Sequence, residues 1–360
     1  MSHPVVTADV AVVGGGIIGL ATAERLTAAG LSVVVVDEAG IAGGATGVSG
    51  GLVRAFAPSD CDEDLASAGL AVYRKRGWHG SWPAVRGRGS LTFLAPGERE
   101  AALPRVASLL EAGHKAEILA ADEIGARFPW LHTVPDEYAV YEPDAGWLPV
   151  RDVAAAMVQD AGPRLRLLRA RATHLLTSGS RVVGVGTDTG PVGARAVLLA
   201  AGTGSTPLAA GVGVHLPLHT RAVGYCLFRL QARAAPLALP AVVDRATGAW
   251  LRPWDNTSVV LAGAFSPLTG VPASVRRDVP HQEVERVRDI LIPRLPRLTG
   301  ASAVGGVAAY DAMSPQGPAS VGVPPEVDGL VTATGWNGGG FKLAPAVGER
   351  AAGLLLEAMA

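Results

Sequence analysis

The sequence predicts an α/β protein in which a mostly antiparallel β-sheet domain is inserted into a parallel-sheet domain. Three observations lead to this fold class. Residues 9–13 form a buried-type strand that runs into a glycine-rich turn and then a helix. Continuous apolar strands at residues 31–36 and 194–201 are typical of a parallel sheet that is covered on both faces. Between residues 220 and 264 the predicted strands are longer and follow one another, as in an antiparallel sheet.

The glycine-rich turn carries Gly14, Gly16 and Gly19 in the spacing G-x-G-x-x-G, and Asp37 ends the second strand. In such a motif the first glycine allows the tight turn and the second lets backbone N–H groups approach a pyrophosphate. The third lets the helix pack on the strand. Asp37 can accept hydrogen bonds from a ribose 2′-OH, which disfavours a 2′-phosphorylated cofactor. Because strand, turn, helix and acidic residue occur in register, the motif predicts a Rossmann-type site for NAD or FAD.

The remaining elements are predicted from apolar periodicity and from the turn residues between them. Predicted helices cover residues 65–76, 98–112, 149–161, 283–292 and 341–358. Predicted strands cover residues 88–94, 165–171, 182–187, 222–228, 249–252, 258–262 and 330–334. A loop of small residues at 40–51 would let the backbone lie close against a ligand. This order assigns the dinucleotide-binding domain to residues 1–77, 141–215 and 306–360, and a substrate domain to residues 78–140 and 216–305.

The composition indicates a folded soluble enzyme, since apolar residues make up 49% and charged residues 18% of the 360 residues. A formal net charge of −1 gives no electrostatic footprint for nucleic acid or an anionic membrane, and no apolar run reaches the length of a membrane span. The early first strand leaves no room for a signal peptide, so the cytoplasm is expected. Neither Cys61 and Cys226 nor the histidines have metal-site spacing, so no metal is expected. The oligomeric state stays open.

Three motifs along the chain resemble those of the D-amino-acid oxidase family of FAD flavoproteins. They are the N-terminal glycine motif, Leu198-Leu-Ala-Ala-Gly202, and the run from Gly335 to Glu349. Within the family, monomeric sarcosine oxidase and related secondary-amine oxidases look most similar, through G-F-K at Gly340–Lys342 and through V-G-aromatic at Val223–Tyr225. The resemblance implies a glutathione-reductase-type FAD-binding fold with the flavin ring between the two domains.

Motifs and resemblance together predict the residues that contact FAD. They are Gly14, Gly16, Ile17, Ile18, Gly19, Asp37, Glu38, Gly44, Ala45, Thr46, Gly50, Gly51, Leu52, Ala201, Gly202, Gly335, Gly338, Gly339, Gly340, Phe341 and Lys342. The glycine-rich turn before the last helix can bring N–H groups and the positive helix dipole against an anion. Beside a flavin, this anion would be the charge that gathers at N1–C2=O during reduction.

A pair of basic residues is the predicted site for a substrate carboxylate. The resemblance implies that Lys342 and Arg54 bind it from opposite ends of the chain, and such a pair would orient the α-carbon over the flavin. Lysine is otherwise rare, because Lys75 and Lys115 are the only others among 31 basic residues. The more common location of both residue types is the surface, where an arginine is solvated and a lysine extends its ammonium into solvent.

Three departures from the family pattern carry predictions of their own. Ala308 stands where several sarcosine oxidases attach FAD through a cysteine, so FAD should be bound non-covalently. Leu261 stands where those oxidases carry an oxygen-activating lysine, so the acceptor is left open between oxygen and another compound. Trp250 and Phe265 replace the family's pocket tyrosine and histidine. As active-site residues they would form an apolar pocket that suits a bulkier or cyclic substrate.

The predicted function is FAD-dependent oxidation of the C–N bond of an amino acid, or of a secondary or cyclic amine that carries a carboxylate. Hydride would pass to flavin N5 and leave an imine. A competing interpretation is an NAD(P)H-dependent flavin monooxygenase, for which Asp328-Gly329 offers a weak motif. Oxidation of a 2-hydroxy acid on the same fold and a non-catalytic FAD-bearing scaffold are also compatible with the motifs.

Overall fold

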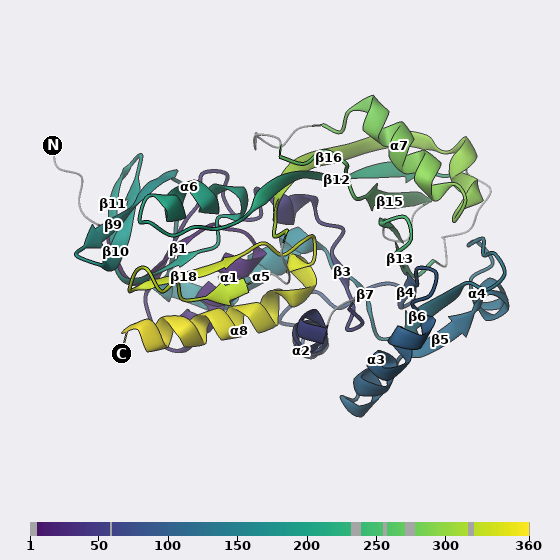
Figure 1. Ribbon diagram of the computed structural model, residues 1–360, viewed down its shortest axis with the longest axis horizontal. Coiled ribbons are helices and arrows are strands. Elements are labelled where there is room, and N and C mark those ends of the chain that lie inside the picture. Colours follow the sequence, from purple (N-terminus) through teal and green to yellow (C-terminus); the bar gives the residue numbers. More distant parts are fainter. Residues whose placement is uncertain are drawn as a thin grey trace.

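The computed structural model describes residues 6–57, 60–231, 239–254, 258–270, 278–315 and 320–359, without the side chains of residues 60–63 and 320. Two lobes lie side by side (Figure 1), and in the described part of the chain each is built around an eight-stranded sheet. The first sheet is mixed with a parallel centre and the second is mostly antiparallel. The predicted fold class is therefore confirmed.

The first sheet has the strand order β17-β18-β11-β1-β2-β8. The bounds are β1 Val6–Val13, β2 Val33–Val36, β8 Leu165–Leu168, β11 Gly190–Leu199, β17 Ser320–Gly322 and β18 Leu330–Thr334. From β18 to β8 neighbouring strands run parallel, and β17 is antiparallel to β18. Parallel strands all end at the same edge, so the loops after β1, β2, β11 and β18 converge there.

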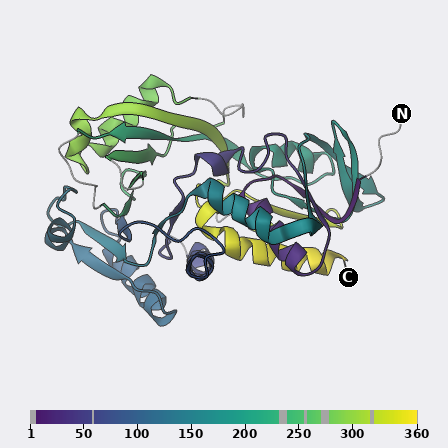
Figure 2. The same cartoon turned by 180° about the vertical axis from the view of Figure 1, so that it is seen from behind.

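Helices cover one face of this sheet. Val10 and Val12 of β1 point into a core formed with α1 (Ile17–Ala28), α5 (Val150–Ala161) and α8 (Gly340–Met359), which lie side by side (Figure 2). The alternate residues Ala11 and Val13 enter a second core on the opposite face. That face is covered by β9 (Ala172–Ser178), β10 (Arg181–Thr187) and α6 (Ser205–Ala210).

One predicted strand is shorter than expected, and an unpredicted strand follows it. Residues 165–171 were expected to form a single strand, but β8 ends at Leu168, after its parallel pairing with β2. The chain then starts β9 at Ala172, and β9 pairs antiparallel with β10 across a turn at Gly179, whose φ is +61°. The apolar pattern did not reveal the break, because Leu165–Leu168 lies at the sheet edge and its side chains are partly exposed.

The second sheet has the order β16-β12-β15-β14-β13-β4-β6-β5. The bounds are β4 Ser90–Phe93, β5 Glu117–Ala120, β6 Tyr138–Glu142, β12 His219–Arg229, β13 Ala241–Asp244, β14 Ala249–Pro253, β15 Val259–Ala264 and β16 Ser302–Met313. All of these pairs are antiparallel except β13 with β4. Because β16 crosses residue 306, the exact domain boundaries stay a prediction.

The two faces of the second sheet have different neighbours. Leu251, Val260 and Ala262 pack in a core with α7 (His281–Leu291). Trp250, Arg252 and Leu261 alternate with them and therefore point to the opposite face. This face turns toward the first lobe, since Arg252 Nε donates a hydrogen bond to the carbonyl of Gly50 at 2.6 Å.

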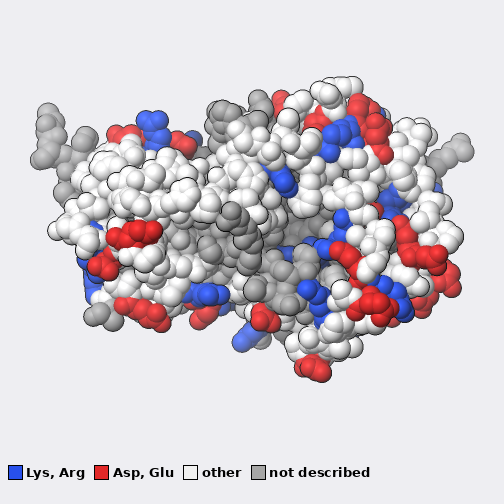
Figure 3. Space-filling view, in the orientation of Figure 1, with Lys and Arg blue, Asp and Glu red and all other residues white. Residues whose placement is uncertain are grey.

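The remaining helices are α2 Asp60–Trp78, α3 Arg99–Glu111 and α4 Ala121–Arg127, and two short strands, β3 Leu52–Val53 and β7 Gly146–Trp147, pair with each other. Basic and acidic side chains of the described residues are interspersed over the face shown in Figure 3. In the described parts of the chain, every helix is too short or too polar to cross a lipid bilayer.

Candidate active site

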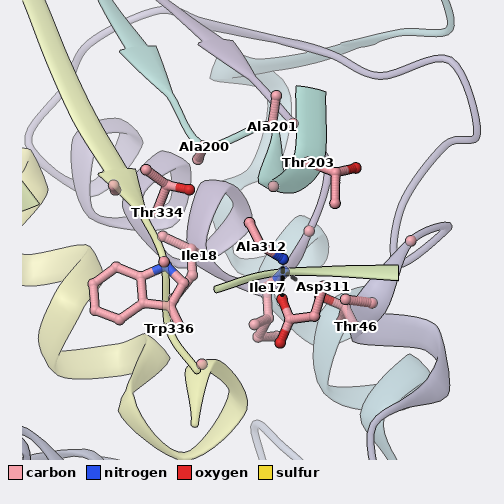
Figure 4. A pocket seen from close by; sticks show the side chains of 18 of the residues that line it. Ile17, Ile18, Thr46, Ala200, Ala201, Thr203, Asp311, Ala312, Thr334 and Trp336 are labelled. Atoms are coloured by element: carbon pink, nitrogen blue, oxygen red, sulfur yellow. Dashed lines mark hydrogen bonds between the residues drawn. The ribbon is translucent and has the colours of Figure 1, made fainter. Parts of the chain in front are cut away.

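A cavity lies where the ends of the parallel strands of the first sheet meet β16 of the second (Figure 4). Many of the residues predicted to bind the cofactor line it: Gly14, Gly16, Ile17, Ile18, Asp37, Gly44, Ala45, Thr46, Ala201, Gly202, Gly335, Gly338, Gly340 and Phe341. The lining also includes residues that were not predicted: Ser49, Ala200, Thr203, Tyr310, Asp311, Ala312, Ala333, Thr334 and Trp336. The structure thus brings the N-terminal, central and C-terminal motifs together.

The N-terminal turn has the geometry that its glycines require. Gly14 has a φ of +115°, and a Cβ there would overlap the carbonyl oxygen of Ala200. A Cβ at Gly19 would overlap the carbonyl oxygen of Gly14, so α1 lies directly against the turn. Gly19 does not line the cavity, because its role is this close packing.

Asp37 stands at the end of β2 and lines the cavity. Its Oδ2 accepts the N–H of Gly15 at 2.7 Å and its Oδ1 accepts the N–H of Ala39 at 2.8 Å. Each carboxylate oxygen can accept a second hydrogen bond, so the side chain can fix the turn and still bind a ribose hydroxyl. The next residue, Glu38, is exposed and is not among the lining residues.

The loop of small residues closes over the start of α1. It contains a 3₁₀ turn at Ala45–Val48, and Thr46 Oγ1 accepts the N–H of Ile17 at 3.0 Å. Gly51 has a φ of +68° and lies against the carbonyl of Leu148, where β3 meets β7. Gly50, Gly51 and Leu52 were predicted to contact the cofactor, but they lie outside the lining of the cavity.

The C-terminal loop supplies the opposite wall. Gly335 and Gly338 have φ values of +79° and +81°, and α8 begins at Gly340. The loop is held to the end of β16, since Asn337 Oδ1 accepts the N–H of Ser314 at 2.8 Å. Gly339 and Lys342, two further predicted contacts, lie outside the lining.

Arg54 and Lys342 both lie near a buried carboxylate, Glu142. Glu142 Oε1 accepts the N–H groups of Ala55 at 2.7 Å and Phe56 at 3.1 Å, the two residues that follow Arg54. Burial raises the pKa of Glu142 above its ordinary value. The hydrogen bonds from Ala55 and Phe56 and the charges of Arg54 and Lys342 lower this pKa, but by less than burial raises it. Desolvation likewise lowers the pKa of Arg54. Glu142 was not predicted from the sequence, because its only signal there is its place at the end of an apolar strand.

Both basic side chains lie outside the lining of the cavity. Arg54 Nε is buried and has no hydrogen-bond partner among the described residues. Lys342 is 7% exposed in the first turn of α8, directly after Phe341 in the cavity wall. Tyr73 of α2 fixes this turn, because its hydroxyl donates to the carbonyl of Phe341 at 2.7 Å. The alternative expectation, that Lys342 lies at the surface, is therefore wrong.

Trp250 and Phe265 reach from the second lobe to the loops of the first. A Cβ at Gly50 would overlap the ring of Trp250, and a Cβ at Gly338 would come within 3.6 Å of Phe265. Phe265 is 53% exposed, and neither Phe265 nor Trp250 is among the residues that line the cavity. Arg252 is the cross-strand partner of Leu261 and stacks on Trp147 with 3.9 Å between guanidinium carbon and ring centroid.

Comparison with known proteins identifies the family. A family model described as "DAO: FAD dependent oxidoreductase" matches residues 9–354. The chain belongs to this family. It is therefore an FAD-dependent oxidoreductase, as the resemblance implied.

Several DAO-family relatives align along most of the chain. 4-Methylaminobutanoate oxidase (formaldehyde-forming) of Paenarthrobacter nicotinovorans is 30% identical over 95% of the chain, which spans 43% of that protein's length. Glycine oxidase of Pseudomonas putida is 28% identical, with 94% of the chain and 92% of the relative covered. The structure of L-proline dehydrogenase from P. horikoshii superposes with a TM-score of 0.86 at 20% identity, over 98% and 94% of the two chains. This last match supports the fold alone.

The DAO-family cavity fits FAD. Gly14 lets the turn after β1 lie directly against Ala200 in the cavity wall, and Asp37 stands where an adenosine ribose is expected. At the other end, the Gly335–Gly340 loop presents the N-terminus of α8 beside Trp336 and Phe341. A dinucleotide extending from the first motif to the second would pass along Thr46, Ala201 and Gly202.

Proposed function

We propose that this protein oxidises the C–N bond of an amino acid, or of a secondary or cyclic amine that carries a carboxylate. The observation that carries the proposal is the pair Arg54 and Lys342 around Glu142, next to the C-terminal wall of the cavity. Two basic side chains beside one buried carboxyl group give this cluster a net positive charge, which suits a substrate carboxylate. The names of the relatives, which include oxidases of glycine and methylaminobutanoate, support the same substrate class.

FAD, when bound, supplies the hydride acceptor for this oxidation. The residues of the chain position the substrate. Arg54 and Lys342 hold the carboxylate, and a guanidinium with an unused N–H is suited to this role. Trp250 and Phe265 lie beside Gly50 and Gly338 and would present apolar rings to the substrate. Positioning of this kind accounts for a large part of the rate in reactions that need no strong base.

Anaerobic flavin reduction tests the proposal directly. Purified protein would be mixed with glycine, sarcosine, L-proline and 4-methylaminobutanoate, and flavin absorbance would be followed without oxygen. We expect at least one amine to bleach the flavin. Bleaching by NADPH alone would favour a monooxygenase, and bleaching by 2-hydroxy acids alone would favour a hydroxy-acid oxidase. No bleaching by any reductant would favour a non-catalytic scaffold.

We further propose that FAD is held non-covalently, because Ala308 offers no thiol for attachment. Ala308 lies in β16 opposite Gly224 of β12. Acid precipitation of the yellow protein should leave essentially all flavin in the supernatant, as measured by absorbance. Flavin that stays with the pellet would contradict the prediction.

The electron acceptor can be predicted from the charges on the inner face of the second sheet. Electron transfer to oxygen creates superoxide, and a fixed cation nearby lowers the barrier. Leu261 offers no charge there, so a cation would have to come from Arg252, which is held by Gly50 and Trp147, or from Lys342. We expect reoxidation by oxygen to be at least about tenfold slower than by a quinone dye at equal concentration. Stopped-flow mixing after reduction with substrate measures both rates. Fast reoxidation by oxygen in both wild type and Arg252→Met would contradict the prediction.

The remaining expectations complete the proposal. The division into an FAD domain (1–77, 141–215 and 306–360) and a substrate domain (78–140 and 216–305) is supported by the two sheets. A cytoplasmic location rests on the sequence alone. Beyond a small-molecule substrate and an electron acceptor, no partner is proposed.

A further inference from the structure

Arg252 is a buried cation of the second lobe that reaches across to the first lobe. It lies on β14, and the residue is only 4% exposed. Its Nε donates a hydrogen bond to the carbonyl of Gly50 at 2.6 Å, and its Nη1 donates to the carbonyl of Pro253 at 2.9 Å. A buried guanidinium is costly unless its N–H groups are hydrogen-bonded, so loss of the contact with Gly50 is unfavourable.

Two aromatic rings hold the plane of this guanidinium. Its central carbon lies 3.9 Å from the ring centroid of Trp147 and 5.3 Å from that of Trp254. A planar guanidinium can stack on such rings, whereas a lysine ammonium is a point charge. Trp147 is 4% exposed and belongs to β7, which pairs with β3 within residues 50–54. Arg252 therefore contacts residues 50–54 directly at Gly50 and indirectly through Trp147.

The segment that Arg252 holds leads to Arg54. The residue before Arg54 is Val53, which pairs with Gly146 of β7. The residue after it is Ala55, whose N–H is bound by Glu142 at 2.7 Å. The pairing of β3 with β7 joins only two residues of each strand, and a pairing this short is marginal without further packing. The contacts of the Arg252 guanidinium supply such packing, so the position of the Arg54 backbone depends on them.

We infer that Arg252 is a positioning residue for substrate binding and that it acts through Arg54. The inference rests on the proposed function, in which the Arg54 guanidinium binds the substrate carboxylate. Because Arg54 Nε has no hydrogen-bond partner among the described residues, the place of this side chain depends strongly on its backbone. A charge-assisted hydrogen bond needs donor and acceptor in alignment, so a shift of residues 50–54 weakens the contact with the carboxylate.

Two substitutions that both remove the charge test this inference. Arg252→Gln and Arg252→Met have side chains of equal length, but only glutamine places an N–H donor, Nε2, where arginine has Nε. Arg54→Leu and the double variant Arg54→Leu/Arg252→Met complete a double-mutant cycle. Arg127→Met is the control, since it removes a 43% exposed charge from the same lobe.

Anaerobic flavin reduction in FAD-loaded protein gives the substrate Kd from its dependence on substrate concentration. The substrate is the amine among glycine, sarcosine, L-proline and 4-methylaminobutanoate that reduces the wild-type flavin fastest. FAD content and Tm are measured for every variant.

We expect Arg252→Met to raise the Kd by about tenfold, as for the loss of one buried hydrogen bond, and Arg252→Gln to recover most of this loss. In the Arg54→Leu background, Arg252→Met should raise the Kd no further, because its effect passes through Arg54. FAD content should match that of wild type, since neither Arg252 nor Gly50 lines the cavity. Arg127→Met should bind substrate as wild type does.

Three results would overturn the inference. An unchanged Kd in Arg252→Met means that Arg54 is positioned without Arg252. Equal losses in Arg252→Gln and Arg252→Met that persist in the Arg54→Leu background mean that Arg252 acts by its charge alone. A parallel fall of affinity, FAD content and Tm in both variants means that Arg252 only holds the lobes together. If Arg54→Leu itself binds substrate as wild type does, the proposed role of Arg54 fails and the inference fails with it. If no amine reduces the wild-type flavin, the proposed function itself fails.

Discussion

Arg54→Leu is expected to weaken substrate binding by about 30-fold to several thousandfold, because removing one partner of a desolvated charge-assisted contact costs about 2–5 kcal/mol. The guanidinium lies partly buried with an unused Nε, so leucine leaves a substrate carboxylate without its donor. Lys342→Met should have a similar effect, since Lys342 is buried beside the same carboxylate, Glu142. Substrate Kd would be measured by anaerobic titration of the flavin absorbance.

A control separates this effect from a general loss of positive charge. Lys115 is 73% exposed and lies close to Asp144 at the surface, so Lys115→Met should leave substrate affinity unchanged. All three variants should bind FAD as wild type does, because neither Arg54 nor Lys342 lines the cavity. Near-native substrate affinity in both Arg54→Leu and Lys342→Met would show that the carboxylate is bound elsewhere.

The parts of the fold that the sequence predicted well are those with a local signal. The first βαβ unit was identified from its closely spaced glycines. Gly14 and Gly19 must be glycine because neighbouring backbone leaves no space for a Cβ at either position. The last helix and the strand before it were also found, since the pattern of apolar residues changes abruptly at Gly335. By contrast, β5, β6 and α4 were missed. They are short, and β6 pairs with β4 and β5, whose residues lie far from it in the sequence.

The same distinction applies to the site. Arg54 and Lys342 could be paired from the sequence only through a family resemblance, because nearly the whole chain lies between them. Glu142 was missed since its hydrogen bonds go to residues 86 and 87 positions earlier. Asp311 was missed for a similar reason, as its contact with Gly338 depends on how β16 meets the C-terminal loop. Acidic residues at such junctions give no periodic signal, and only the assembled fold shows which cavity they face.

Gly14→Ala is expected to abolish FAD retention during purification. Gly14 has a φ of +115°, where a side chain is strained, and the new Cβ would overlap the carbonyl of Ala200. The backbone strain costs about 1–3 kcal/mol, and the overlap with Ala200 costs a similar amount. The overlap would push the turn after β1 away from the end of β11. These two segments form the wall that faces the cofactor, so their separation removes backbone N–H groups from the pyrophosphate. FAD content would be measured from the ratio of flavin to protein absorbance.

Gly30→Ala provides the matched control for backbone strain without overlap. Gly30 has a φ of +89° at the end of α1, and a Cβ there would meet nothing within 4 Å. This variant should lose about 1 kcal/mol of stability and still retain FAD, because the site of strain lies outside the cavity. The two variants therefore share the strain and differ in the contact with Ala200. If Gly14→Ala purifies with a full complement of FAD and the wild-type Tm, the close approach of Gly14 to Ala200 does not shape the cofactor site.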